Sequence, residues 1–174
     1  MDSPKVENRS ETREIRILLE DPALDMTWSR FGPHEQGAEP HVHDAHVDGF
    51  YVLEGELTFG VGPERTEVRA RPGTAVLVPP GVVHAFDNAS DGTTVWLNFH
   101  APSTGFAAFL RGERGGFDST DPPADGGRPA ADAMVIVDAD RAELGGLVLE
   151  LSSTPGERHF ELADGRVLNV LVRQ

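Results

Sequence analysis

The chain has 174 residues, of which 39% are hydrophobic, so it is long and apolar enough to form one domain with its own core. Its 29 acidic and 15 basic residues give a net charge of −14, which disfavours binding to nucleic acid or to anionic membranes. It contains no cysteine, which excludes disulfides, thiolate metal ligands and a cysteine nucleophile. The polar N-terminus lacks the apolar run of a signal peptide, and no stretch approaches the ~18 apolar residues of a membrane-spanning helix, so we expect a cytoplasmic protein.

Most of the chain after a flexible polar tail (1–13) has the pattern of short strands separated by turns. The turn residues Gly, Asp, Asn and Ser occupy the connections. Alternating or continuously apolar runs lie at 13–20, 24–31, 49–62, 66–70, 74–79, 82–88 and 93–100. Short strands at regular spacing predict an all-β barrel or sandwich, built as one domain over residues 14–174.

The pattern changes after residue 100. Phe106, Phe109 and Leu110 have helical spacing and predict one short outer helix over about 103–113, capped by Ser103 or Thr104. We expect its apolar face to cover the barrel or to form a dimer contact. The Gly-, Pro- and Asp-rich stretch that follows predicts a long loop, either a flexible connector or a lid over a pocket. That loop spans 115–133, and strands are predicted again within 134–172, at 134–138, 146–151 and 166–172.

Four side chains in the first half of the chain are suited to bind a divalent transition metal. His41 and His43 are two residues apart, so on a strand they face the same side. Asp48 follows, and His84 comes directly after a Pro-Pro-Gly turn. Three neutral imidazoles and one carboxylate form a ligand set for Fe, Ni, Co, Mn, Cu or Zn, with one or two positions left for a substrate or dioxygen.

Other polar side chains near these ligands have alternative interpretations. His46 is close enough in sequence to compete with Asp48, although we expect Asp48 to be the ligand. Asn98 and His100 line the cavity if they point inward from the strand at 93–100, but a structural role is the preferred interpretation for His100. Purely structural roles are expected for Asn88 in a turn and for Phe50, Tyr51 and Phe59 in the core.

The segments 37–55 and 73–88 resemble the two conserved motifs of the cupin superfamily. The second motif is matched in full, by Gly73, Pro79, Gly81, His84 and Asn88. The first motif is matched by His41, His43 and Gly55, with Asp48 where the family carries glutamate. Aspartate is one methylene shorter, so its oxygen reaches a metal only if the backbone moves closer. A second departure is Glu35, at a position where the family often has glycine.

This resemblance implies an antiparallel double-stranded β-helix, the jelly-roll barrel of cupins, with the metal bound by His41, His43 and His84. Asp48 is then either the acidic ligand or a general base. Among single-domain cupins the layout resembles the bacterial quercetinase-like dioxygenases, which implies a metal-dependent dioxygenase acting on a small organic molecule, and a homodimer. Two alternatives remain open: a non-catalytic metal- or ligand-binding cupin module, and a metal-assisted isomerase or lyase.

Overall fold

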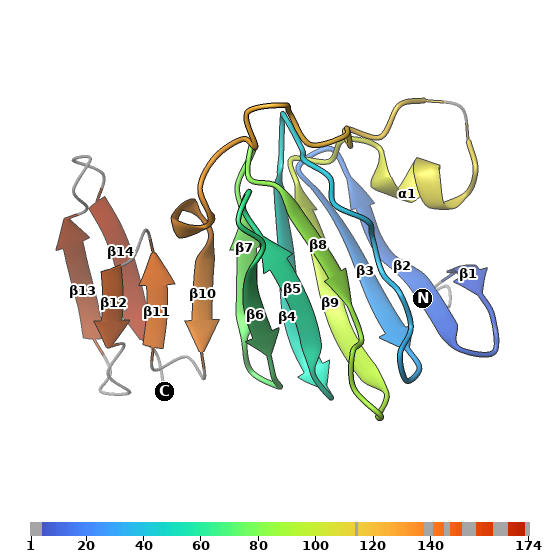
Figure 1. The fold of residues 1–174 in the computed structure, drawn as a ribbon, viewed down its shortest axis with the longest axis horizontal. Helices are drawn as coiled ribbons and strands as arrows, with labels where there is room; N and C mark the ends of the chain where they lie inside the picture. The colour runs from blue at the N-terminus through green and yellow to red at the C-terminus, as the bar shows by residue number, and fades with distance from the viewer. Residues whose placement is uncertain are drawn as a thin grey trace.

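The computed structural model describes residues 5–113, 115–137, 141–144, 147–150, 156–161 and 167–172, and they form mostly antiparallel β-structure (Figure 1). The larger sheet has the strand order β1 (Lys5–Arg9), β2 (Arg13–Asp21), β3 (Leu24–Phe31), β9 (Thr94–Ala101), β4 (Val47–Glu54), β7 (Ala75–Val78), β10 (Met134–Val137), β11 (Arg141–Leu144) and β12 (Leu147–Glu150). The smaller sheet has the order β6 (Thr66–Ala70), β5 (Leu57–Val61), β8 (His84–Asp87), and β13 (Gly156–Glu161) pairs with β14 (Val167–Val172).

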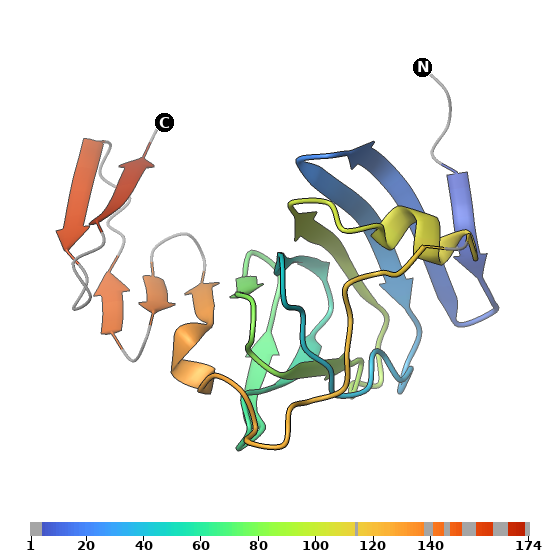
Figure 2. The same ribbon diagram turned by 90° about the horizontal axis from the view of Figure 1, so that it is seen from above.

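The two sheets enclose one apolar core. Figure 2 gives the view of the strands from above. Side chains alternate between the core and the surface along each strand, as in β3, where every second residue is buried. Phe50 and Trp96 enter this core from the larger sheet, and Leu57 and Phe59 enter it from the smaller one. The predicted all-β jelly-roll fold is therefore confirmed.

The strand register brings polar residues together at one end of this core. β4 lies between β9 and β7, and Asp48 is paired with His100 on one side and with Val78 on the other. Asp25 of β3 is paired with the same His100 from the opposite direction. Because paired residues on adjacent strands point to the same face of a sheet, Asp25, His100 and Asp48 form one buried polar row.

Two motif glycines are required by the backbone. Gly55, in the β4–β5 turn, has φ +74°, and a Cβ there would lie 2.2 Å from the Thr93 carbonyl oxygen. Gly81 has φ +81° and follows the two prolines that precede His84. Since non-glycine residues rarely adopt such angles, these positions fix where the chain turns toward the histidines.

Several local expectations differ from the structure. Residues 5–9, expected in a flexible tail, form β1, which pairs with β2. The helix α1 (Phe106–Leu110) is shorter than predicted, and Gly105 rather than Ser103 or Thr104 is its N-cap. Tyr51, expected in the core, is 39% exposed on the outer face of β4, whereas Phe50 and Phe59 are buried as predicted.

The late strands at 134–138, 146–151 and 166–172 are present as β10, β12 and β14. No sequence pattern indicates β11 or β13, which are short and carry charged residues. A 3₁₀ turn (Ala130–Asp132) closes the predicted long loop. Among the described residues, no helix is long and apolar enough to cross a membrane.

Asn88 stabilises the barrel end by satisfying buried backbone groups. Its side-chain amide donates to the carbonyls of Gly32 and Gly92, each at 2.7 Å, and its oxygen accepts from the Ser90 backbone amide. Asn88→Ala leaves these groups unpaired, so we expect a loss of about 1–3 kcal/mol in the free energy of unfolding, measured by urea denaturation. The matched control is Thr93→Ala at an exposed neighbouring position, with an expected change within about 0.5 kcal/mol. Equal effects of both substitutions would contradict this role.

Candidate metal centre

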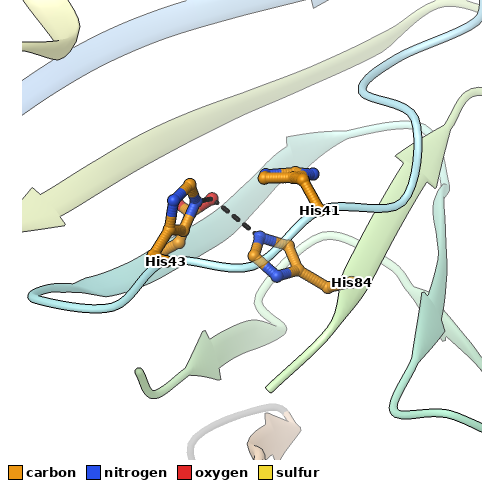
Figure 3. Close-up of side chains that lie close together, drawn as sticks. His41, His43 and His84 are labelled. Atoms are coloured by element: carbon orange, nitrogen blue, oxygen red, sulfur yellow. Dashed lines mark hydrogen bonds and ion pairs between the residues drawn. The ribbon is translucent and has the colours of Figure 1, made fainter. Parts of the chain in front are cut away.

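Backbone pairing brings the two histidine segments together. His41 and His84 form an isolated antiparallel bridge, in which each backbone amide donates to the other residue's carbonyl, at 3.0 and 2.9 Å. His41 and His43 lie in the segment before β4 rather than in a regular strand, and His84 is the first residue of β8. Figure 3 shows the three rings turned toward a common space.

The four predicted ligands converge as the sequence led us to expect. One ligand atom from each of His41, His43, Asp48 and His84 lies within 4.8 Å of the others. The Oδ2 atom of Asp48 is 3.2 Å from His84 Nε2 and 3.5 Å from His43 Nε2. Asp48, His43 and His84 are buried, whereas His41 is half-buried at the edge of the cavity.

Hydrogen bonds to carbonyl oxygens orient all three imidazoles, and for His41 and His43 they set the tautomer that a metal requires, whereas His84 Nε2 also lies 3.2 Å from Asp48 Oδ2. A carbonyl oxygen only accepts, so a ring Nδ1 that contacts one must donate its proton and leave Nε2 with a free lone pair. The contacts are His41 Nδ1 to the Glu39 carbonyl (2.8 Å), His43 Nδ1 to the Asp118 carbonyl (2.5 Å) and His84 Nδ1 to the Val82 carbonyl (3.2 Å). His43 Nε2 is buried and makes no hydrogen bond, so this donor set fits a bound metal ion.

The charges of the site also fit a cation. Burial and the neighbouring His84 lower the pKa of His41 to about 4, so this imidazole is neutral at pH 7. Burial alone raises the pKa of Asp48, but the neighbouring imidazoles of His100, His43 and His84 outweigh it and hold the pKa well below its usual value. A buried carboxylate beside the neutral His41 ring attracts a positive ion.

The predicted loop at 115–133 is attached to the first histidine segment. Thr120 and Val42 exchange two backbone hydrogen bonds, each of 3.0 Å. The carboxylate of Asp118 accepts from the backbone amides of Asp44 (3.1 Å) and Ala45 (2.7 Å), while its carbonyl fixes His43. Of the two interpretations given above, these contacts favour a cover over the site rather than a loose connector.

A cavity of about 570 Å³ opens above the candidate metal centre. Its floor carries His41, His43 and Asp48, and its walls carry Phe86 and aromatic residues from α1 and the loop. Phe106 and Phe117 have ring centroids 5.0 Å apart, and Phe106 also packs against His100 at 4.1 Å. An ordinary apolar pocket with a few converging polar groups is the usual form of a small-molecule site.

Sequence reasoning did not find every residue of this site. A structural role is the preferred interpretation of His100 in the sequence, yet His100 lines the cavity, and its Nε2 lies 3.8 Å from Asp48 Oδ1. Asn98, left open between an inward and an outward position, donates to the same carboxylate oxygen at 2.6 Å. The alternation of inward and outward side chains along β9 is the sequence signal that places Asn98 and His100 on the same face. Asp118 and Phe117 lie in a loop without periodicity, so no sequence pattern pointed to them.

Comparisons with known proteins agree with the motifs and with the fold. Residues 27–100 match the family model described as the cupin domain. KdgF from Halomonas sp. has a similar structure, with a TM-score of 0.50 and 21% sequence identity over 57% of this chain and 88% of its own. A conserved protein with a double-stranded β-helix domain from Klebsiella pneumoniae has a TM-score of 0.51 and 20% identity over 67% of this chain and 90% of its own. No curated protein matches the sequence.

The double-stranded β-helix with histidines from two segments at one end defines the class of protein, a small barrel with a candidate metal centre. The match over residues 27–100 then adds a family likeness: this part of the chain is similar to the cupin domain. The solved structures support the fold alone, because both are less than 25% identical to this chain.

His84 supplies one ligand from the smaller sheet, so its removal opens the site on that side. We expect His84→Ala to raise the dissociation constant for the first equivalent of Co²⁺ by at least about 100-fold, since the loss of even an outer-shell partner costs about 10–100-fold. The measurement is a Co²⁺ titration followed by elemental analysis. His34→Ala removes a 65% exposed imidazole outside the site and serves as the matched control. Wild-type affinity in His84→Ala would contradict the site.

Asp118 attaches the loop to the segment that carries His43. Asp118→Ala removes the carboxylate that holds Asp44 and Ala45, so we expect the loop carbonyl to hold His43 less well and metal affinity to fall by about 10-fold. Asp125→Ala, in the same loop, removes a carboxylate that accepts from the Gly127 backbone amide, and this control is expected to bind metal normally. Equal metal affinity in both variants would show that loop attachment does not support the site.

Proposed function

We propose that this protein is a metal-dependent enzyme acting on a small aromatic molecule with an ionisable hydroxyl group, and that its reaction is a quercetinase-like dioxygenation. The observation that carries the proposal is a His/Asp ligand set at the floor of a cavity walled by phenylalanine rings. Polar floor and apolar walls suit a flat molecule whose hydroxyl points to the metal and whose rings contact Phe106 and Phe117.

The cavity volume and charge support the same substrate class. A space of about 570 Å³ is within the range of pockets that enclose drug-sized ligands. The rim residues Glu39 and Asp121 are acidic, and the whole chain carries a charge of −14. These charges disfavour phosphorylated or polyanionic substrates.

The carboxylate of Asp48 can serve either as a metal ligand or as a proton acceptor. Asn98 donates to Oδ1, which leaves Oδ2 directed toward the imidazoles of His43 and His84. In that position the carboxylate either completes the metal shell or accepts the proton of the substrate hydroxyl. A bound divalent metal supplies Lewis acidity and open coordination positions for substrate and dioxygen. The residues of the chain hold the ligands, exclude water and place the proton acceptor.

Oxygen uptake tests the proposal directly. The chelated protein is reloaded separately with Fe²⁺, Mn²⁺, Co²⁺, Ni²⁺ or Cu²⁺ and mixed with 3-hydroxyflavone or other enolisable aromatics in an oxygen electrode. We expect metal-dependent uptake of one O₂ per substrate consumed, and His84→Ala is expected to lower the rate by at least about 100-fold, as for the loss of a residue that acts in the reaction. Substrate turnover without oxygen uptake would favour the isomerase or lyase alternative, and binding without turnover would favour the binding module.

Asp48→Glu separates the two roles of the carboxylate. Glutamate is the usual residue of the resembled motif, so the variant is expected to keep or tighten metal binding if Asp48 is a ligand. Full metal occupancy with a large loss of oxygen uptake would instead assign the proton-accepting role. The homodimer and the cytoplasmic location expected above remain predictions.

A further inference from the structure

A second group of histidines lies beside the four-residue centre and shares one member with it. One ring nitrogen from each of His43, His46 and His100 lies within 4.8 Å of the others. All three side chains are almost fully buried, with exposures of 2%, 1% and 2%. Buried imidazole nitrogens need partners, so the hydrogen bonds of this group can be followed one at a time.

The contacts of the Asn98 side chain show which ring nitrogen of His100 carries a proton. Its side-chain nitrogen contacts two groups that only accept, Asp48 Oδ1 at 2.6 Å and the Gly49 carbonyl at 3.0 Å. Both amide protons are therefore used there, and Asn98 Oδ1 is an acceptor. His100 Nε2 lies 3.0 Å from this oxygen and must donate to it. A neutral His100 then has a lone pair and no proton on Nδ1.

The contacts of Asp118 show in the same way which ring nitrogen of His46 carries a proton. Asp118 Oδ2 accepts from the Ala45 backbone amide at 2.7 Å and lies 2.9 Å from His46 Nδ1. A carboxylate in this position accepts, so His46 Nδ1 carries the proton, and Thr104 Oγ1 contacts the same nitrogen at 2.9 Å. A neutral His46 then has a lone pair on Nε2.

These two lone pairs face each other. His46 Nε2 and His100 Nδ1 are 2.9 Å apart, and no proton is available to join them if both rings are neutral. A positive charge removes the repulsion, either a proton shared on the line between the two nitrogens or a metal ion held to one side of that line. Two nitrogens bound at right angles to one metal at about 2.0–2.1 Å are separated by about 2.9 Å, which matches this contact.

We propose that His43, His46 and His100 form a second position for a divalent transition metal. The third nitrogen is His43 Nε2, the buried ring nitrogen that makes no hydrogen bond. The ring centroids of His43 and His46 are 4.1 Å apart. All three ligands keep a proton-accepting partner on their other nitrogen, the arrangement found around protein-bound metals.

The two positions compete for His43, because one Nε2 lone pair binds one ion. When His43 binds at the second position, His41, His84 and Asp48 remain at the first, which is a set of two histidines and one carboxylate. The first position holds the carboxylate and is occupied first, and the second fills at higher metal concentration. This inference concerns metal binding and does not depend on which substrate the protein uses.

Co²⁺ titration of variants tests the second position without any enzyme assay. His41→Ala/His84→Ala removes two ligands of the first position and is expected to bind about one Co²⁺ per chain, more weakly than wild type. Addition of His100→Ala is expected to weaken that binding by at least about 10-fold. Circular dichroism confirms folding, and His41→Gln/His84→Gln replaces the pair if the alanine variant unfolds. A folded double variant that binds no better than the triple variant overturns the proposal.

Nitrogen NMR of the wild-type protein provides a second test. Histidine ¹⁵N resonances are followed in the chelated protein during addition of Zn²⁺. We expect His46 Nε2 and His100 Nδ1 to move after the first equivalent, as these atoms bind the ion. If both nitrogens instead keep the signature of a shared proton at excess Zn²⁺, a proton occupies the gap and the second position is excluded. Loss of oxygenase activity alone would not affect either result.

Discussion

A buried carboxylate surrounded by imidazole rings is the constraint on which this site depends. Asp48 is 2% exposed, and the His41 imidazole beside it is neutral at pH 7 because burial lowers its pKa to about 4. An unpaired negative charge in such a place is costly, so the surrounding structure must supply either a cation or several hydrogen bonds. Asn98 supplies one bond to Oδ1, and Oδ2 is left facing two ring nitrogens. The fold thus holds a negative charge where a divalent ion fits.

The rest of the barrel positions this charge and its neighbours. β4 carries Asp48 between β9 and β7, and the His41–His84 bridge joins the two histidine segments. The loop after α1 adds the Asp118 carbonyl that orients His43 and the Phe117 ring that walls the cavity. The candidate metal ligands, their hydrogen-bond partners and the cavity therefore come from four separate parts of the chain. A change in the loop reaches the candidate metal centre through the Asp118 contacts to His43, Asp44 and Ala45.

The sequence contained enough to predict the barrel and the four candidate ligands that converge in the structure, because their signals are local. Alternation of apolar residues marked the strands, and the spacing of His41, His43 and His84 about the Gly81 turn marked the ligands. The partners of these ligands depend on contacts between distant segments, as between Asp118 and His43, which are 75 residues apart. No local pattern encodes such a pair. The position of Tyr51 was misjudged for a related reason, since composition alone does not say which face of β4 is buried.

Anomalous X-ray diffraction at the absorption edge of a bound metal tests the central claim most directly. Crystals of the protein loaded with one equivalent of Co²⁺ are measured above and below the cobalt edge. The account predicts one dominant peak bounded by the Nε2 atoms of His41, His43 and His84, with an oxygen of Asp48 on the same side. A dominant peak away from these atoms, with the three rings still held by their carbonyl partners, would contradict it.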